Sequence, residues 1–312
     1  MSSWETAAKD LGSFFSNDPI ARWQNDLILE VDVAERVALI TGSSSGIGLL
    51  TAIELARGGY RVVATMRDLS RRTRLDEAAG RAGVAGQLDV RRLDVTETDT
   101  IRALVEAVVR EHGRIDVLVN NAGFAMAGFV EDLRLAEIRQ QFETNFFGHV
   151  AMTKAVLPAM RRQRSGHIIM VSSISGRVGQ PVLSSYSSSK FALEGWSEAL
   201  RLETFSLGIR VVLVEPGAFG TDIWQRNAKI GEDAFSADSP NRERGERFAA
   251  MAKKLHKADA IVVARLIARI AADPNPKLRY RIGFDAHLQR WLRALLPWRI
   301  YEKLVVKAVK ID

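Results

Sequence analysis

Short runs of β-branched and aliphatic residues alternate with longer amphipathic segments along most of this chain. The apolar runs predict strands within residues 36–41, 61–66, 87–95, 115–123, 167–173, 209–216 and 278–283. A helical period predicts helices at residues 46–57, 97–112, 134–163, 184–207 and 258–272. Strands that alternate with helices in this way pair in parallel, in one sheet covered on both faces. Right-handed crossovers make that sheet doubly wound, so we expect an α/β fold with a doubly wound parallel sheet of about seven strands.

The two ends of the chain differ from this pattern and from each other. Residues 1–35 have no strong period and hold two Lys/Arg against seven Asp/Glu, and they predict a partly helical N-terminal arm. The alternating pattern covers residues 36–283. Residues 284–312 form a basic amphipathic C-terminal extension, and residues 277–312 hold nine Lys/Arg against three Asp/Glu. The chain therefore divides into an arm, a sheet-forming domain and an extension.

Composition and charge argue against several classes of protein. Without cysteine, the chain has no disulfide framework and no thiolate nucleophile. The five histidines show no metal-ligand spacing, and we predict no metal site. The formal net charge of +7 is concentrated in the C-terminal extension, so it does not indicate a nucleic-acid partner. We find no secretory signal pattern and no apolar stretch of about 18 residues, and we expect a cytoplasmic protein.

A glycine-rich turn, T-G-S-S-S-G-I-G at residues 41–48, follows the first predicted strand and opens the first predicted helix. Glycine lets the backbone approach a bound pyrophosphate, and the free N–H groups of a helix N-terminus stabilise phosphates. Gly42, Gly46 and Gly48 are spaced G-x-x-x-G-x-G, which differs from the commoner G-x-G-x-x-G pattern. Glycines also serve ordinary turns, so this segment predicts a dinucleotide site only together with the motifs that follow.

Tyr186 and Lys190 are four residues apart in a predicted helix, which places them on one face, one turn apart. The phenol of a free tyrosine has a pKa of about 10. A neighbouring ammonium and an oxidised nicotinamide both favour the tyrosinate and lower that pKa. Tyr186 can then exchange a proton with a carbonyl or alcohol oxygen. Ser173, at the end of a predicted strand, is placed to hydrogen-bond the same oxygen. A tyrosine and a lysine at this spacing usually form a solvated pair on a surface helix. Here the glycine turn and Ser173 also lie at predicted strand ends, and together they favour a catalytic pair.

These motifs, with N-N-A-G at residues 120–123 and a P-G-x-x-x-T pattern at 216–221, resemble the short-chain dehydrogenase/reductase family over residues 36–283. The string S-K-F-A-L-E-G at 189–195 is similar to the 17β-hydroxysteroid and retinol dehydrogenase branch. The resemblance implies a Rossmann-type, NAD(P)-binding catalytic domain. The catalytic residues that it implies are Asn145, Ser173, Tyr186 and Lys190. The cofactor-binding residues that it implies are Gly42, Ser43, Ser44, Gly46, Ile47, Gly48, Arg67, Asp94, Val95, Asn121, Ala122, Gly123, Tyr186, Lys190, Pro216, Gly217 and Thr221.

The resemblance also implies individual roles within these sets. Asp94 is expected to contact the adenine amino group, and Asn121 to help hold the central strands. Lys190 is expected to bond the nicotinamide ribose hydroxyls, and Asn145 to help hold a water that extends a proton relay from that lysine. The residues expected against the nicotinamide carboxamide are Pro216, Gly217 and Thr221.

The second predicted strand indicates which coenzyme is used. NAD-dependent relatives carry an acidic residue at its end, which binds the adenosine ribose hydroxyls, but Met66 stands there in this chain. Arg67 follows, and a guanidinium can form paired bonds to a 2′-phosphate. Ser43 and Ser44 can add hydrogen bonds. Asp68 leaves an alternative open, in which Arg67 is a solvated loop residue and Asp68 binds the ribose. We favour NADP over NAD.

The substrate pocket is expected to form from residues 124–130, 174–182 and 218–256. The apolar candidates in it are Phe124, Met126, Phe129, Phe219, Ile223, Trp224 and Phe235. Apolar lining suits an apolar ligand, although several of these residues can serve packing alone. Gly217 and Gly220 can let residues 218–256 act as a lid that excludes water.

The C-terminal residues 286–310 carry tryptophans and aliphatic residues among basic ones, and Pro297 divides them into two short helices. Such a segment can lie on an anionic membrane surface. It can instead pack on the protein, either over the substrate cleft or against the acidic arm, and we favour packing of this kind. The family resemblance also implies a homodimer or homotetramer that pairs through residues 134–163 and 184–207.

The function predicted from the sequence is an NADP-preferring oxidoreductase that interconverts a ketone or aldehyde and the alcohol, on an apolar small-molecule substrate. Tyr186 acts as the general acid and base. Two alternatives stay open: an NAD-linked alcohol dehydrogenase, and a non-catalytic nucleotide-binding or scaffold protein.

Overall fold

The computed structural model describes residues 35–220, 228–234, 236–254 and 258–311. Except for Glu35, the predicted N-terminal arm lies outside the described residues.

The described chain is built on one sheet of seven parallel strands. The strands are β1 (Arg36–Ile40), β2 (Tyr60–Met66), β3 (Leu88–Arg92), β4 (Val117–Asn120), β6 (Gly166–Val171), β7 (Ile209–Pro216) and β9 (Arg279–Ile282). Their order in the sheet is β3-β2-β1-β4-β6-β7-β9. The chain thus moves outward from β1 to β3, returns to β4 and moves outward on the other side. Each predicted strand is present, and the predicted doubly wound α/β fold is confirmed.

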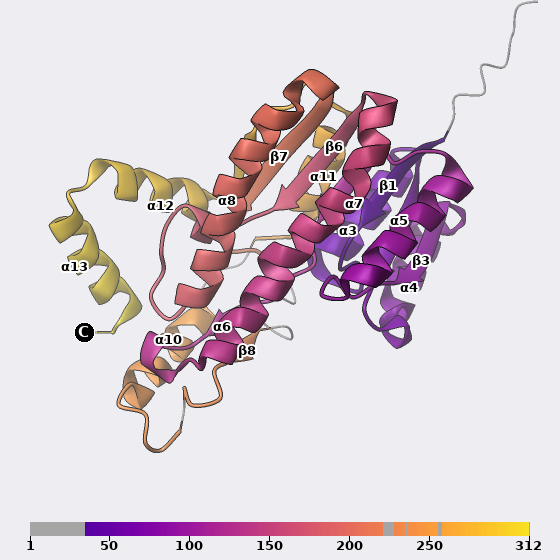
Figure 1. Cartoon of the computed structure of the whole chain (residues 1–312). Helices are drawn as coiled ribbons and strands as arrows, with labels where there is room; N and C mark the ends of the chain where they lie inside the picture. Colours follow the sequence, from indigo (N-terminus) through magenta and orange to yellow (C-terminus); the bar gives the residue numbers. More distant parts are fainter. Residues whose placement is uncertain (1–34, 221–227, 235, 255–257, 312) are drawn as a thin grey trace, which may run out of the picture. The chain divides into compact units, whose positions relative to one another are not determined.

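Helices cover both faces of the sheet, because its strands are apolar on both sides (Figure 1). One face packs on α3 (Gly46–Arg57), α4 (Thr73–Ala82) and α11 (Ile261–Ala272). The other packs on α5 (Thr98–His112), α7 (Gly148–Gln163) and α8 (Ser184–Thr204). The central β4 and β6 contribute fully buried side chains to both layers, such as Leu118 to one and Val119 to the other.

The edge strand β9 is held to the sheet by ion pairs as well as by its backbone. Arg279 Nε lies 3.0 Å from Glu194 Oε2 and 3.2 Å from Glu215 Oε1. Arg281 Nε lies 3.1 Å from the other Glu215 oxygen. Glu215 is fully buried in β7, and a buried carboxylate is costly unless it is paired in this way.

The long helix predicted at residues 134–163 is continuous but not uniform. It begins as α6 (Leu135–Phe142), passes through π-helical turns at Glu143–Phe147 (η4) and continues as α7. A π-helical segment of this kind is rare and is frequent at functional sites. The predicted catalytic residue Asn145 lies within it.

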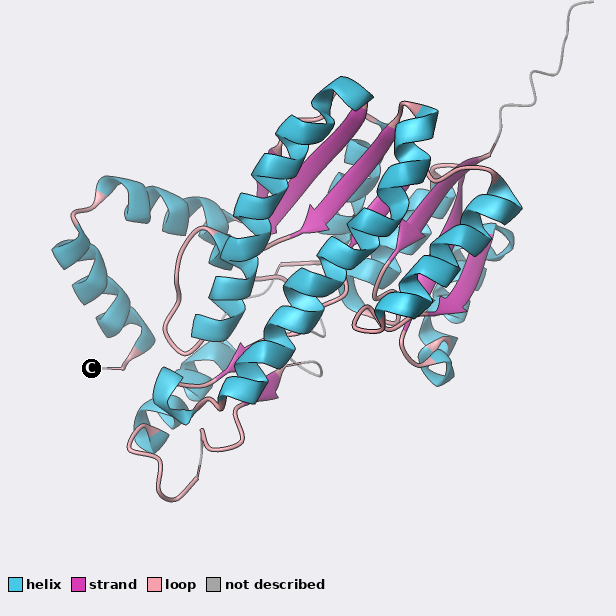
Figure 2. Ribbon diagram, in the orientation of Figure 1, coloured by secondary structure: helices cyan, strands magenta, loops and turns pink. Residues whose placement is uncertain are grey.

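Beyond the carboxyl ends of the strands lies a second group of elements (Figure 2). A small parallel ladder joins β5 (Met126–Ala127) to β8 (Lys229–Ile230), and α10 (Arg242–Lys254) follows it in the chain. The helices α12 (Phe284–Leu295) and α13 (Trp298–Val309) flank Pro297 as predicted. The remaining short 3-10 segments are η1 (Leu69–Arg71), η2 (Ala85–Gln87), η3 (Val130–Asp132), η5 (Ile174–Gly176) and η6 (Phe205–Leu207). In the described part of the chain, no helix has the length and apolar character needed to cross a membrane.

Candidate active site

A cavity of about 1290 Å³ runs along the carboxyl ends of the strands. One part is bordered by the glycine turn at residues 42–47 and by the ends of β2 and β4. Tyr186, Lys190 and Ser173 line its middle. The far part is apolar and is bordered by α10, α12 and α13. The switch in strand order between β1 and β4 lies at the first part, which is where ligands bind in open α/β sheets.

The glycine turn is tight enough to exclude larger residues at two of its positions. Gly42 has a φ of 71°, and a Cβ on it would lie 2.8 Å from the Ala122 Cα. A Cβ on Gly48 would lie 2.3 Å from the Gly42 carbonyl oxygen and 2.4 Å from Asn121 Nδ2. Gly42 therefore allows the left-handed turn, and Gly48 allows α3 to pack closely against it.

The N-terminus of α3 is suited to bind an anion. Its N-cap residue Ser45 makes no side-chain capping bond, and the first turn holds no acidic residue. Ser44, Ser45, Gly46 and Ile47 all border the cavity. Uncapped N–H groups and the positive end of the helix dipole thus face this space. These features fit the pyrophosphate of a dinucleotide.

Ser43 does not border the cavity. It is fully buried, its N–H donates to the Thr65 carbonyl at 2.8 Å, and its hydroxyl donates to the Ile40 carbonyl at 3.5 Å. It therefore fixes the turn against β2 rather than facing the cavity. Of the predicted serine pair, only Ser44 borders the space.

Asn121 links the two central strands, as predicted. Its Nδ2 donates to the carbonyls of Thr41 at 2.9 Å and Gly42 at 3.0 Å. In return, the Thr41 hydroxyl accepts the backbone N–H groups of Asn121 and Ala122, each at 3.0 Å. The carboxyl ends of β1 and β4 are thereby fixed to each other where the chain crosses from one half of the sheet to the other.

At the end of β2, Met66, Arg67, Asp68 and Arg71 border the cavity. The Arg67 side chain is 75% exposed, and its Nε lies 3.9 Å from an Asp94 oxygen. The carboxylate of Asp68 accepts the Ser70 N–H at 3.0 Å and caps η1, and hydrogen bonds from Ser70 lower its pKa. Asp68 therefore already has a local partner. Sequence reasoning missed Arg71, a second cation four residues after Arg67.

Tyr186, Lys190 and Ser173 come together where β6 ends and α8 begins, and all three are buried. The hydroxyls of Tyr186 and Ser173 hydrogen-bond to each other. Lys190 Nζ donates to the Val171 carbonyl at 2.8 Å and lies 5.9 Å from the centre of the Tyr186 ring. The predicted helix spacing thus places phenol and amine on one side of α8.

The expected lowering of the phenol pKa by the ammonium together with an oxidised nicotinamide stays a prediction, and burial of the pair acts in the opposite direction. Burial raises the pKa of Tyr186 to about 12, and the hydrogen bond from Ser173 offsets only part of this rise. Burial likewise lowers the pKa of Lys190 to about 8, against the opposing charge of Glu194. The reason is that desolvation dominates in this enclosed site. The phenol is therefore fully protonated at neutral pH.

Asn145 is fully buried and does not border the cavity. Its Oδ1 accepts the Phe124 N–H at 3.1 Å and its Nδ2 donates to the Phe124 carbonyl at 2.9 Å. The side chain thus holds the turn that follows β4. A Cβ on Gly123 would lie 3.1 Å from the Asn145 amide oxygen, which explains the glycine there. The water-holding role of Asn145 stays a prediction.

Of the other predicted cofactor residues, Asp94, Val95, Ala122, Gly123, Pro216 and Gly217 border the cavity. Thr221 lies outside the described residues. Asp94 Oδ1 accepts both the N–H and the hydroxyl of Thr96. The carboxylate of Asp285, from α12, accepts the Ala218 N–H at 2.7 Å, and a Cβ on Gly217 would lie 2.1 Å from it. The loop after β7 is thus closed by the C-terminal extension.

Among the predicted pocket residues, Phe124, Phe129 and Phe219 border the cavity, whereas Met126 is buried away from it in β5. Ile223, Trp224 and Phe235 lie outside the described residues. The apolar far wall comes from two segments that the sequence analysis placed at the cleft, residues 218–256 and 286–310. Its residues, which the pocket candidates above did not include, are Phe248, Met251, Leu292, Tyr301, Leu304 and Val305. In α13 the wall residues have the helical spacing 301, 304, 305 and 308, a signal that the sequence does carry.

The comparisons with known proteins agree with this geometry. The sequence model of the short chain dehydrogenase family matches residues 36–230. The chain belongs to this family. It is therefore an NAD(P)-dependent dehydrogenase/reductase, as the sequence resemblance implied.

Similar sequences and structures come from several sources. The uncharacterized oxidoreductase YusZ of Bacillus subtilis is 41% identical over 88% of this chain and 98% of its own. Retinol dehydrogenase 8 of Bos taurus is 39% identical, over 80% and 81% of the two chains. A short-chain dehydrogenase structure from Streptomyces avermitilis has a TM-score of 0.73 and 32% identity, and the match covers 86% of this chain and 97% of that one. A metagenomic short-chain oxidoreductase in complex with NADP has a TM-score of 0.63 and 26% identity, over 79% and 96%.

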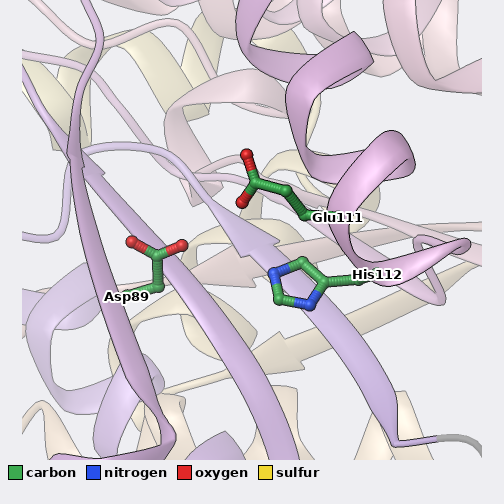
Figure 3. Close-up of side chains that lie close together, drawn as sticks. All are labelled: Asp89, Glu111 and His112. Atoms are coloured by element: carbon green, nitrogen blue, oxygen red, sulfur yellow. The ribbon is translucent and has the colours of Figure 1, made fainter.

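One group of side chains in the described part of this dehydrogenase could in principle hold a cation, namely Asp89, Glu111 and His112 (Figure 3). Arg91 forms ion pairs with both carboxylates, with Asp89 at 2.5 Å. These bonds raise the pKa of the arginine and lower that of Glu111. A guanidinium between two carboxylates already neutralises them, so we interpret the group as a structural ion-pair cluster beside β3.

Proposed function

We propose that this short-chain dehydrogenase is an NADP-dependent enzyme that interconverts an apolar ketone or aldehyde and its alcohol, with Tyr186 as the general acid and base. The observation that carries the proposal is the position of the Tyr186 hydroxyl. It is buried beside Ser173, between an anion-binding turn and an apolar chamber. A carbonyl group reaching this point from the chamber meets both hydroxyls at once.

The residues divide the reaction among them. The bound nicotinamide supplies a hydride to the carbonyl carbon, or accepts it in reverse. Tyr186 is protonated at neutral pH and donates its proton to the carbonyl oxygen. Ser173 hydrogen-bonds the same oxygen as negative charge develops on it. Lys190, one turn away, holds a positive charge close to the phenol and, with a pKa of about 8, can return a proton to it.

An apolar substrate is supported by the chamber itself and by one relative. Phe124, Phe129 and Phe219 line the near side, and α10 and α13 supply the far side. Such a lining favours a bulky hydrocarbon group. The similar bovine protein is named for retinol, which has a long apolar chain.

The catalytic role is tested by replacing Tyr186 with phenylalanine, which removes only the transferable proton. With NADPH and a panel of steroid, retinoid, fatty and small carbonyls, we expect kcat to fall about 10²–10⁴-fold. NADPH affinity, measured by fluorescence titration, should stay within about threefold, since the ring remains. Tyr60→Phe is the matched control, because that phenol donates to the Ala271 carbonyl outside the cavity. A Tyr186→Phe enzyme that keeps more than a tenth of wild-type turnover would contradict the proposal and favour a non-catalytic role for the pair.

The preference for NADP is supported by Arg67 and Arg71 at the end of β2 and by the local bond that occupies Asp68. A charged hydrogen-bonding pair contributes roughly 1.5–3 kcal/mol. We expect Arg67→Gln to raise the KM for NADPH about 10–100-fold and to change the KM for NADH less than threefold. Asp68→Asn serves as the opposing variant. If Asp68→Asn raises the KM for NADH and Arg67→Gln leaves the KM for NADPH unchanged, the enzyme is NAD-linked.

A further inference from the structure

The helix α12 carries an apolar stripe that faces away from the rest of the molecule. Phe284, Leu288, Trp291 and Leu295 are spaced by four, three and four residues, so they lie along one side of the helix. Their exposed fractions are 83, 44, 60 and 70%. Ala286, on the opposite side, is fully buried and packs on the segment after β6. A continuous exposed stripe of this kind marks an interaction surface.

The helix α13 carries a stripe of positive charge. Arg299, Lys303 and Lys307 are spaced by four residues each, so they lie along one side of the helix, and all three are exposed. Lys310, which follows as the C-cap residue, is exposed as well. Residues 284–310 hold six Lys/Arg against two Asp/Glu. One of these two, Asp285, is turned inward onto the Ala218 N–H. The outward charge of the helix pair is therefore strongly positive.

The turn between the two helices has the side chains typical of a membrane interface. Trp298 is exposed next to Pro297, and the Arg293 guanidinium lies 4.7 Å from the centre of its ring. Tryptophan and arginine have an apolar body and a polar end, which suits the headgroup region of a bilayer. In Figures 1 and 2 the two helices extend to one side of the molecule, beyond α8.

We propose that the α12–α13 pair is the docking surface of this protein for an anionic lipid bilayer. Apolar side chains insert at the acyl boundary while lysines and arginines attract anionic headgroups, and this combination is what a lipid surface requires. A protein partner would have to supply an acidic face complementary to α13 as well as an apolar groove for α12. The bilayer supplies both without a specific shape.

The same two helices form the wall of the substrate chamber. Leu292 of α12 and Leu304, Val305 and Ala308 of α13 border the cavity beside the exposed stripes. The proposed docking surface is therefore continuous with the wall of the chamber. This step rests on the proposed function: an apolar carbonyl compound dissolved in the bilayer would enter the chamber directly. The substrate class is therefore a membrane-dissolved lipid rather than a water-soluble carbonyl.

Sedimentation of the full-length protein with vesicles tests the proposal. We expect binding to vesicles of phosphatidylcholine with about one third phosphatidylserine to be at least tenfold tighter than to phosphatidylcholine alone, and to weaken in high salt. Lys303→Gln/Lys307→Gln should weaken binding about fivefold per lysine, and only on the anionic vesicles. Trp291→Ser/Leu295→Ser should weaken it more than tenfold on both compositions.

Matched controls are Arg102→Gln/Arg110→Gln, two exposed cations of α5, and Val262→Ser, an exposed apolar residue of α11. These should bind as the wild type does. The proposal is overturned if the full chain does not bind anionic vesicles. In that case the acidic arm or a second copy of the chain covers the helices instead. It is also overturned if the stripe variants bind as well as the controls. Tyr186→Phe should bind vesicles normally, so failure of the proposed chemistry is distinguishable from failure of docking.

Discussion

His149 is a fully buried histidine one turn after Asn145, close to Lys190. Its Nε2 lies 2.8 Å from the Ala122 carbonyl and so helps to fix the turn after β4. Among the described residues no partner is found for its Nδ1. Burial, with the charge of Lys190, lowers the pKa of this imidazole to about 3. The ring is thus neutral at every pH at which the enzyme is expected to work.

This burial predicts how stability depends on pH. The unfolded chain protonates His149 below a pH of about 6.5, whereas the folded protein resists protonation until a pH of about 3. The stability that this neutral ring contributes is therefore present above the unfolded pKa and is lost as the pH falls from there. We expect the free energy of unfolding to decrease by up to about 1.4 kcal/mol per pH unit in this window.

Urea denaturation of the wild type and of His149→Asn, at pH 7.5, 6, 5 and 4, measures this dependence. His149→Asn should be less stable at neutral pH but should lose stability less steeply on acidification. His167, whose pKa burial also lowers, contributes in the same direction and remains in both proteins. His287→Asn, at an exposed histidine, is the control and should keep the wild-type slope. Equal slopes for His149→Asn and the wild type would exclude the assigned protonation state.

Residue types and spacing were sufficient to find most of the site, but not the direction of each side chain. Tyr186, Lys190 and Ser173 come together because a helical period of four and the end of a strand are visible in the sequence. The inward turn of Ser43 depends on a hydrogen bond to β2, which is 22 residues away in the chain. Whether burial or charge controls the Tyr186 pKa likewise depends on the depth of the pocket, which no local pattern encodes.

At the scale of elements, regular segments were predictable and short or weakly apolar ones were not. Each strand of the main sheet carries a run of β-branched or aliphatic residues. The helix α4 was missed because it buries only Leu75 and Ala79 among polar residues. The ladder of β5 with β8 joins segments about 100 residues apart through two residue pairs, so it has no local signal. The π-helical turns at 143–147 also depend on tertiary contacts, here the two bonds of Asn145 to Phe124.

At the scale of the whole molecule, two helices of the described chain present a face without a partner. Leu202 of α8 is 81% exposed, and Phe191 and Phe205 lie along the same side at helical spacing. Phe147, at the start of α7, is also exposed. Large apolar side chains gathered on one face are typical of subunit contacts. They support the homo-oligomer implied by the family resemblance.

Sedimentation velocity tests this assembly. We expect the 34.6 kDa chain to sediment as a dimer or tetramer at micromolar concentration, because a two-fold contact would bury these exposed side chains against their copies. Leu202→Asp should weaken association at least tenfold, whereas Val262→Asp on α11 should leave the mass unchanged. A wild-type protein that stays monomeric throughout the concentration range would contradict the predicted assembly.

Asp285 has a consequence for how such a chain can be shortened. Its carboxylate, from the first turn of α12, completes the hydrogen bonding of the loop after β7, between two glycines that leave room for it. A homologue ending directly after β9 would retain the sheet and the tyrosine–lysine pair, yet its loop would have an unsatisfied amide where the coenzyme ring is expected. Removing the C-terminal helices would therefore weaken coenzyme binding before it affected folding. These helices are thus part of the expected coenzyme site and cannot be removed without loss.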